Sequence, residues 1–342
     1  MIPVFDGHND ALTRERDSDL ATRGNRGHLD LPRMRDGGMR GGIFAIFTPS
    51  PGESSRQISF RAKGSYSEPL AEPLPHAEAV THAGGAAERL LDLERRGELV
   101  VGRSIADIDA AHDGTSPPVA VMHLEGAEAI DENLANLDEW YGRGLRSLGP
   151  VWSRPNAFAH GVPFAFPSSP DTGPGLTGPG RRLVSACGEL GILVDLSHLN
   201  EAGFWDVADL EAGPLVASHS GAHALCPASR NLTDRQLDAI GASGGLLGIV
   251  FATPFLRPGF ADDPDTPLRL IVDHARYVAD RIGIEHVALG SDFDGATIPV
   301  GLRGVAGLPR LLEALETGGF GSEEVAAIGW RNWRRVLDAW WR

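Results

Sequence analysis

The sequence of 342 residues is poor in cysteine and lysine and contains no long apolar run. Its two cysteines, Cys187 and Cys226, are too few for a disulfide framework, so we expect a reducing compartment. No stretch approaches the roughly 18 consecutive apolar residues of a membrane-spanning helix. The opening segment MIPVFDGHND also lacks the basic and apolar regions of a signal peptide. These absences predict a soluble, cytoplasmic protein.

Positive charge is the scarcer sign, with 31 basic against 46 acidic residues and a formal net charge of −15. Such a balance repels nucleic-acid phosphates and anionic membrane surfaces, so we expect neither as a partner. We expect a small molecule as the partner, and the sequence is also compatible with a homodimer. With 42% hydrophobic residues, the chain can bury a large core, which excludes a disordered protein.

Eight short apolar segments, bounded by glycine, proline or polar residues, recur along the chain and are typical of buried parallel strands. They are Ile2–Phe5, Ile43–Phe47, Val119–His123, Leu145–Leu148, Ile192–Leu196, Leu215–Ser218, Leu246–Val250 and Val287–Gly290. Helical spacing separates or follows most of them, at Ala77–Arg96, Glu132–Tyr141, Gly178–Leu190, Ala202–Leu210, Thr233–Ala242, Leu268–Ile282, Leu308–Leu315 and Glu323–Trp341. This alternation predicts an α/β fold of the closed (β/α)₈ barrel type.

The alternative fold is an open doubly wound sheet. It requires a glycine-rich phosphate turn after an early strand, where this sequence reads Asp6-Gly-His-Asn-Asp10. We therefore expect residues 1–342 to form a single barrel domain. Two segments, at about 48–75 and 153–177, are too long for ordinary turns, and each follows a predicted strand. We expect both to shape a pocket at the C-terminal face of the barrel, or to form a subunit contact.

Histidines and carboxylates follow the predicted strands, where a barrel keeps its reactive groups. Three imidazoles and three carboxylates occupy such positions: His8, Asp10, Glu125, His198, His219 and Asp292. Each one alone is compatible with a hydrogen-bonded structural residue, but their shared placement favours one site. His123 fits a packed interior residue, and His223 fits a helix start or a partner of the site.

Imidazole and carboxylate ligands together suit Zn²⁺ and similar ions, and six groups exceed the needs of one tetrahedral ion. Two metal ions would use them, with His8 and Asp10 on one ion and His198 and His219 on the other. Some dinuclear barrel hydrolases bridge their ions with a carbamylated lysine, but the only lysine, Lys63, lies in a polar loop segment. Glu125 is therefore the expected bridging ligand.

Several motifs together resemble the membrane (renal) dipeptidase family of dinuclear zinc peptidases, over nearly the whole chain. They are Asp6-Gly-His-Asn-Asp10, His123-Leu-Glu-Gly126, Asp195-Leu-Ser-His198, Ser218-His-Ser220, Ser229-Arg-Asn-Leu-Thr233, Gly290-Ser-Asp-Phe-Asp-Gly295 and Gly329-Trp-Arg-Asn-Trp-Arg-Arg-Val336. The resemblance implies a soluble, bacterial-type member with a (β/α)₈ barrel and two Zn²⁺ per chain. It also implies the same five metal ligands that the strand ends suggest.

The resemblance further implies that Arg230 holds the substrate carboxylate and that Asp292 lies near the bridging water. A guanidinium is always charged and pairs with carboxylates through two hydrogen bonds, which suits the first role. The alternative for Arg230 is a surface residue at a helix start. Asp292 is either a further metal ligand or a proton shuttle, and the resemblance favours the shuttle. Asp294 is expected to be structural.

One segment departs from the family pattern, in which a histidine after the fourth strand contacts the substrate. Our alignment places Trp152 there, and an indole N–H donates a hydrogen bond but cannot become cationic. His160 and Arg154, in the same long loop, are the candidates for replacing that donor. Trp152 and His160 therefore join Arg230 among the expected substrate-binding residues.

These observations predict a zinc-dependent dipeptidase that hydrolyses dipeptides with a metal-bridging hydroxide. One alternative keeps the dinuclear site and changes the substrate to an N-acyl amino acid, a lactone or a β-lactam amide. Another is a non-catalytic binding protein on an inherited barrel, which the exchange at Trp152 suggests. Intact metal ligands argue against this last reading.

Overall fold

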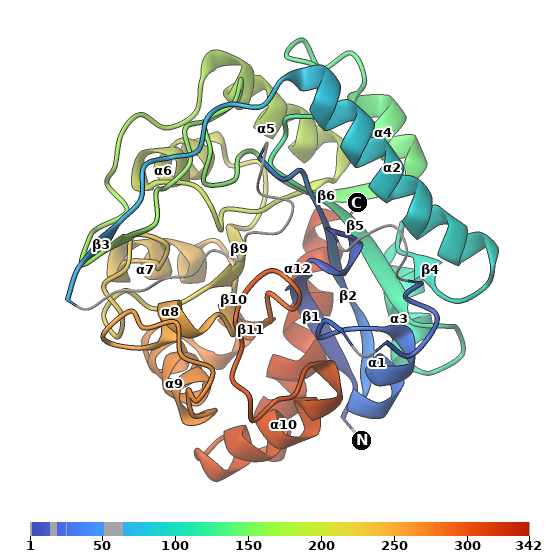
Figure 1. Ribbon diagram of the computed structural model, residues 1–342, viewed down its shortest axis with the longest axis vertical. Helices are drawn as coiled ribbons and strands as arrows, with labels where there is room; N and C mark the ends of the chain where they lie inside the picture. The colour runs from blue at the N-terminus through green and yellow to red at the C-terminus, as the bar shows by residue number, and fades with distance from the viewer. Residues whose placement is uncertain (1, 14–18, 25, 51–63, 342) are drawn as a thin grey trace.

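The computed structural model describes residues 2–13, 19–24, 26–50 and 64–341, and within them eight parallel strands form a barrel surrounded by helices (Figure 1). Five of these strands pair in the order β1-β2-β5-β6-β8, and three pair in the order β11-β10-β9. Their bounds are β1 Val4–Asn9, β2 Met39–Phe47, β5 Val119–Glu125, β6 Leu145–Gly149, β8 Leu193–Val194, β9 Val216–Ser220, β10 Leu246–Val250 and β11 Val287–Gly290. Each predicted strand corresponds to one of them.

Isolated bridges join the two sheets into a ring. Asp195 pairs with Val216 between β8 and β9, and Asn9 pairs with Phe293 between β1 and the segment after β11. The backbone N–H of Leu196 donates to Val216 over 2.8 Å, and that of Asp10 donates to Phe293 over 2.8 Å. The predicted (β/α)₈ barrel is therefore confirmed.

Helices on the outside connect most of the strands (Figure 1). They are α1 Leu31–Gly37, α2 His76–Arg95, α3 Ile105–His112, α4 Leu137–Arg143, α5 Gly178–Leu190, α6 Glu201–Leu210, α7 Asp234–Ala242, α8 Thr253–Leu256, α9 Arg269–Ile282, α10 Leu308–Thr317, α11 Ser322–Ala326 and α12 Asn332–Trp340. None of the helices in these ranges is both long and apolar enough to cross a membrane.

One predicted helix begins later than expected, at Leu137 rather than at Glu132. Leu134 adopts a φ of 65°, in the left-handed region that interrupts a helix. The side chain of Asn136 accepts from the backbone of Asp131 over 2.9 Å and donates to Ala129 over 2.9 Å. Because Asn136 offers the backbone these alternative hydrogen bonds, the segment before α4 forms turns.

The start of β1 packs on the C-terminal segment of the chain. The Phe5 ring lies 5.5 Å from that of Trp330 and 5.8 Å from that of Trp333, measured between centroids. Trp333 also donates from its indole N–H to the carbonyl of Leu289 over 2.9 Å. A Cβ at Gly7 would stand 2.3 Å from the Trp333 indole, so only glycine allows this approach. The C-terminal segment thus fixes the strand that carries His8.

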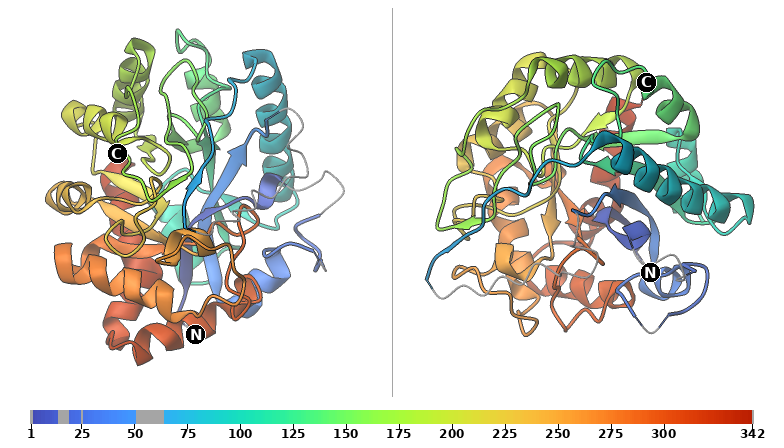
Figure 2. Two further views of the ribbon diagram at one scale, coloured as in Figure 1. Left: turned by 60° about the vertical axis from the view of Figure 1, so that its left-hand side comes forward. Right: turned by 45° about the horizontal axis from the view of Figure 1, so that its top comes forward.

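The two long segments contact one another. Within them, β3 (Tyr66–Ser67) pairs antiparallel with β7 (Ala165–Phe166), while residues 51–63, including Lys63, lie outside the described ranges. The short strand β4 (Val100–Val101) pairs with β5 near its start. Figure 2 shows the extended chain between β3 and α2 running across the barrel toward that helix.

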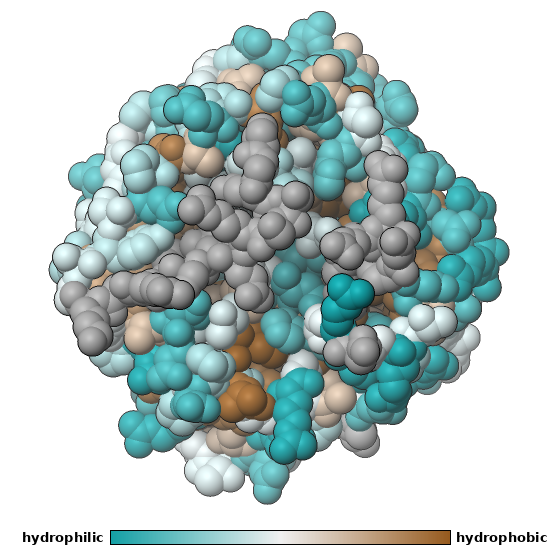
Figure 3. Space-filling model, viewed as in Figure 1, coloured by the Kyte–Doolittle hydropathy of each residue, from teal (hydrophilic) through white to brown (hydrophobic). Residues whose placement is uncertain are grey.

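Polar side chains dominate the visible surface in Figure 3. In the described part of the chain, only Val80 and Val300 are exposed among large hydrophobic residues. Cys187 and Cys226 are both buried free thiols.

Candidate metal centre

The candidate centre has two halves, His8 with Asp10 and His198 with His219. The first half is carried by β1 and the residue that follows it. Asp6, His8 and Asp10 alternate along an extended segment, so their side chains share one face. Asp6 accepts from the backbone N–H of Ser291 over 2.7 Å and from its hydroxyl over 2.8 Å, which ties this segment to the end of β11. His8 Nε2 then lies 3.5 Å from Asp10 Oδ2.

The second half lies after β8 and within β9. His198 Nε2 and His219 Nε2 approach each other to 3.1 Å, although His198 follows β8 and His219 lies in β9. Glu125, at the end of β5, lies between the two halves. Its Oε1 is 3.0 Å from His198 Nε2 and 3.8 Å from His219 Nε2, whereas its Oε2 is 3.6 Å from His8 Nε2. Each oxygen of this carboxylate therefore faces a different half.

Ligand atoms of these residues gather closely enough to hold metal ions. In each of three groups the atoms lie within 4.8 Å of one another: His8 with Asp10 and Glu125, Glu125 with His198 and His219, and His8 with His219 and Asp292. Among the described residues, neither ring nitrogen of the fully buried His8 has a hydrogen-bond partner. A buried polar group without a partner costs free energy, and a metal ion would satisfy this one. The donor set thus fits a metal.

Burial and charge set the protonation of these groups. Burial lowers the pKa of His198 to about 4, and the Arg230 charge acts in the same direction. Burial likewise holds the pKa of His219 well below its ordinary value. Burial alone would raise the pKa of Glu125, but the His8 charge and the hydrogen bond to His198 hold it well below its ordinary value. Neutral His198 and His219 beside the Glu125 carboxylate are the forms that bind a metal ion. Burial alone would lower the pKa of His8, but the charge of Glu125 and the neighbouring Asp10 raise it well above its ordinary value, so a metal ion there would displace a proton.

Serine hydroxyls contact the Nδ1 atoms of the two histidines in the second half. Ser153 Oγ lies 3.0 Å from His198 Nδ1, and Ser218 Oγ lies 2.8 Å from His219 Nδ1. Their placement leaves Nε2 of each ring facing Glu125. Sequence reasoning missed both contacts, although the position of Ser218 beside His219 was a signal for one.

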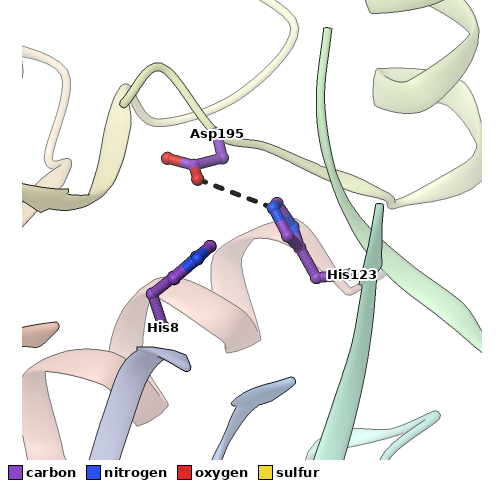
Figure 4. A group of neighbouring side chains, drawn as sticks. All are labelled: His8, His123 and Asp195. Atoms are coloured by element: carbon purple, nitrogen blue, oxygen red, sulfur yellow. Dashed lines mark ion pairs between the residues drawn. The ribbon is translucent and has the colours of Figure 1, made fainter. Parts of the chain in front are cut away.

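The candidate ligand His8 also forms a buried trio with His123 and Asp195 (Figure 4). His123 Nδ1 contacts Ser147 Oγ over 2.8 Å, and its Nε2 lies 3.8 Å from Asp195 Oδ2. This interior placement matches the reading of His123 as a packed residue. The oxygens of Asp195 already accept four hydrogen bonds from serine groups, so we place Asp195 and His123 in the support of the centre.

Arg230 is buried against the second half. Its Nη groups donate to the carbonyls of Ser197 and His219, and one of them lies 3.2 Å from His198 Nε2. Its Nε has no partner among the described residues. Burial lowers the pKa of the Arg230 guanidinium to about 10, which still leaves it charged at neutral pH. The buried Nε–H of Arg230 is therefore available for a further hydrogen bond.

Trp152 packs at the edge of the same half, with its ring centroid 5.8 Å from His198 and 4.9 Å from Phe47. Arg154 is buried and pairs with Glu128 over 3.0 Å, so its charge is already engaged. His160 is partly exposed and makes no hydrogen bond or ion pair with a described residue. Of the three loop candidates, only Trp152 is seen to contact a proposed ligand.

Asp292 adjoins the first half. It adopts a φ of 59°, and its backbone N–H donates to the carbonyl of His8 over 3.0 Å. Burial and the charge of Glu125 raise its pKa. A Cβ at Gly295 would stand 2.3 Å from Asp292 Oδ1 and 2.2 Å from Asp10 Oδ2, so glycine leaves room for both carboxylates. Asp294 accepts from the backbone of His28 over 2.5 Å, as expected of a structural residue.

A barrel with histidines and carboxylates gathered at the C-terminal strand ends is typical of metal-dependent hydrolases. The family model for membrane dipeptidase (peptidase family M19) matches residues 1–340. The chain belongs to this family, as its motifs predicted, and is a metallo-dipeptidase that hydrolyses peptide bonds. Family membership also implies a metal cofactor.

Two solved structures resemble this chain closely. A metallopeptidase from Rhodobacter sphaeroides, liganded with a phosphinate mimic of the dipeptide L-Ala-D-Ala, is 46% identical with a TM-score of 0.95, covering 99% of both chains. The dipeptidase AC, of the same peptidase family, is 46% identical with a TM-score of 0.93, again over 99% of both chains. The curated dipeptidase ataJ from Aspergillus terreus is 28% identical, covering 98% of this chain and 84% of its own.

Proposed function

We propose that this protein hydrolyses dipeptides with two Zn²⁺, one held by His8 and Asp10 and the other by His198 and His219. Glu125 is the shared ligand. The observation that carries the proposal is that the two Glu125 oxygens face histidines of different halves. Histidine nitrogens with carboxylate oxygens are the ligands of catalytic zinc. When bound, zinc lowers the pKa of a coordinated water to about 7 and polarises a carbonyl oxygen.

Asp292 is the proposed proton carrier. Its carboxylate takes the proton of the attacking water and passes it to the leaving amine. Burial and the charge of Glu125 raise its pKa, which favours uptake of a proton from the attacking water. The backbone hydrogen bond to His8 keeps Asp292 beside the first half of the centre.

Arg230 is proposed to hold the C-terminal carboxylate of the substrate. Its buried Nε–H, which has no partner among the described residues, is available to an anion. Because the similar Rhodobacter enzyme binds a mimic of L-Ala-D-Ala, dipeptides with a D-residue at the C-terminus are the first substrates to test. We propose that Trp152, directly before the long loop 153–177, and His160, within it, contribute to substrate selection.

We further propose a single barrel domain, a cytoplasmic location and a homodimeric assembly for this chain. Residues 1–342 form one barrel domain, in which the loops 48–75 and 153–177 shape the substrate pocket. The pairing of β3 with β7 supports a joint role for these loops. A cytoplasmic location is supported by the free, buried Cys187 and Cys226. A homodimer is the proposed assembly, to be tested by its mass in solution.

The test is Asp292→Asn, which removes the proton acceptor and keeps the size of the side chain. We expect kcat on L-Ala-D-Ala to fall about 10²–10⁴-fold with unchanged metal content. Normal turnover by this variant would contradict the shuttle. A panel of L,L- and L,D-dipeptides beside N-acyl amino acids, lactones and β-lactams tests the substrate class, and a preference for a non-peptide would replace the dipeptidase assignment.

A further inference from the structure

We infer that Asp195 is a positioning residue that acts through Ser218 to keep the His219 proton on Nδ1 and the Nε2 lone pair free for a metal ion. This inference rests on the proposed metal centre. Asp195 itself touches neither substrate nor metal in that centre. Its role is to decide which nitrogen of His219 can bind.

Asp195 is buried and surrounded by hydrogen-bond donors. Its Oδ1 accepts from the backbone N–H of Ser197 over 3.1 Å, from the Ser197 hydroxyl over 2.7 Å and from the backbone N–H of Ser218 over 2.8 Å. Its Oδ2 accepts from the Ser218 hydroxyl over 2.6 Å. A carboxylate with four donors around it is ionised and can only accept.

The single hydrogen on the Ser218 hydroxyl then fixes the tautomer of His219. The Ser218 hydroxyl has one hydrogen, and Asp195 takes it, so its Oγ can only accept over the 2.8 Å contact with His219 Nδ1. The Ser197 hydroxyl, 3.2 Å away, gives its own hydrogen to Asp195 and cannot compete. His219 must therefore carry its proton on Nδ1. Such outer partners commonly orient metal-binding histidines.

His198 provides an internal comparison. Its Nδ1 lies 3.0 Å from the Ser153 hydroxyl, and Ser153 has no carboxylate partner within the described ranges. The Ser153 hydrogen can point toward or away from the ring, so this serine does not dictate a tautomer. Of these two serines, Ser218 alone has a carboxylate partner among the described residues, and that partner is Asp195.

The experiment is Asp195→Asn, which reverses one hydrogen bond and keeps the others. The three donors on Oδ1 hold the amide oxygen in place, so the amide N–H₂ group replaces Oδ2 beside Ser218. It then donates to the Ser218 hydroxyl, whose hydrogen turns to His219 Nδ1 and moves the ring proton to Nε2. We expect the affinity for one of the two Zn²⁺ to fall about 10–100-fold, measured by competition with a chelator.

Adding Ser218→Ala to Asp195→Asn supplies the decisive control. It removes the hydroxyl that imposes the wrong tautomer, so we expect the double variant to bind zinc more tightly than Asp195→Asn alone. A merely structural loss would make the double variant no better. Ser153→Ala, the matched change beside His198, removes a hydrogen bond but imposes no tautomer, so we expect it to weaken zinc binding less than Asp195→Asn does.

Two results would overturn the inference: Asp195→Asn binding both ions within twofold of the wild type, or a double variant no tighter than the single one. Nitrogen-15 NMR of the metal-free wild type adds a test that needs no variant. We expect a protonated Nδ1 and a bare Nε2 on His219, and a protonated Nε2 would refute the role of Asp195. A wild type that binds no metal would instead contradict the proposed function, while the NMR result still decides this inference.

Discussion

The two halves of the candidate centre are supported in different ways. His198 and His219, in the second half, each have a serine hydroxyl on Nδ1. His8, in the first half, has no hydrogen-bond partner at either ring nitrogen among the described residues. The protein thus orients the second half by its own hydrogen bonds, whereas under the proposed function the first half relies on its carboxylates and on the proposed metal ion.

The halves also differ in the groups beside them. The cation Arg230 lies against His198 and His219, while the carboxylate Asp292 adjoins His8. A substrate carboxylate is drawn to the cation, and proton transfer requires a carboxylate near the reacting bond. Under the proposed function, the second half therefore positions the substrate end and the first half handles the proton.

The largest expected effect comes from Glu125→Gln, which acts on both halves at once. The amide keeps the size of the side chain but removes the charge that faces His8 on one side and His198 on the other. We expect weaker binding of both metal ions and a fall in kcat/KM of at least about 10³-fold. Metal analysis and dipeptide turnover check this. Glu132→Gln, at an exposed position, is the matched control.

If Glu125→Gln released only one ion and left the other bound as in the wild type, the two halves would not share this carboxylate. The control variant is expected to keep full metal content and turnover. A loss of metal by Glu132→Gln as well would point to a general effect of charge.

The next largest effect is expected on the second half alone, from Arg230→Met. The change removes the buried cation, so we expect kcat/KM for free dipeptides to fall about 10²-fold, equivalent to about 3 kcal/mol. Dipeptide amides, which lack the terminal carboxylate, should be affected far less. Arg235→Met is the control, because the Arg235 side chain is 78% exposed.

An equal loss for acids and amides would separate Arg230 from substrate recognition and leave it a structural role beside His198. Kinetics with the two substrate series on one preparation distinguish these outcomes.

The sequence predicted the strands, and it predicted that the candidate ligands lie together, because both follow from local pattern. Buried parallel strands require apolar runs, and the polar residue after each run then lies at the barrel mouth, as Glu125 and His198 do. Contacts between distant loops leave no such pattern. Ser153 reaches His198 across 45 positions, and nothing in its surroundings indicates that partner. The late start of α4 was missed because Leu134 has an apolar side chain that fits a helix.

The smallest predicted effect is on the free energy of unfolding. In metal-free protein, we expect a variant in the first half to increase it and a variant in the second half to decrease it. Burial and the neighbouring charges of Glu125 and Asp292 raise the pKa of Asp10 well above its ordinary value. In metal-free protein, we therefore expect Asp10→Asn to increase the free energy of unfolding by about 1–2 kcal/mol, because it removes a buried charge among like charges. With zinc present, the same variant should be less stable than the wild type, since it loses a ligand.

His219→Leu, in the second half, should lower stability by about 1 kcal/mol in metal-free protein and also with zinc, because it breaks the contact with Ser218.

The two variants should also differ in how their stability depends on pH. A raised carboxyl pKa means that the folded state binds the proton more tightly than the unfolded chain, so ionisation destabilises the fold as pH rises. The gain from Asp10→Asn should then be largest at high pH and shrink as pH falls, whereas the loss from His219→Leu should persist. Denaturant unfolding with and without chelator measures both variants, and an Asp10→Asn effect of one sign in both conditions would contradict the dependence of the first half on its ion.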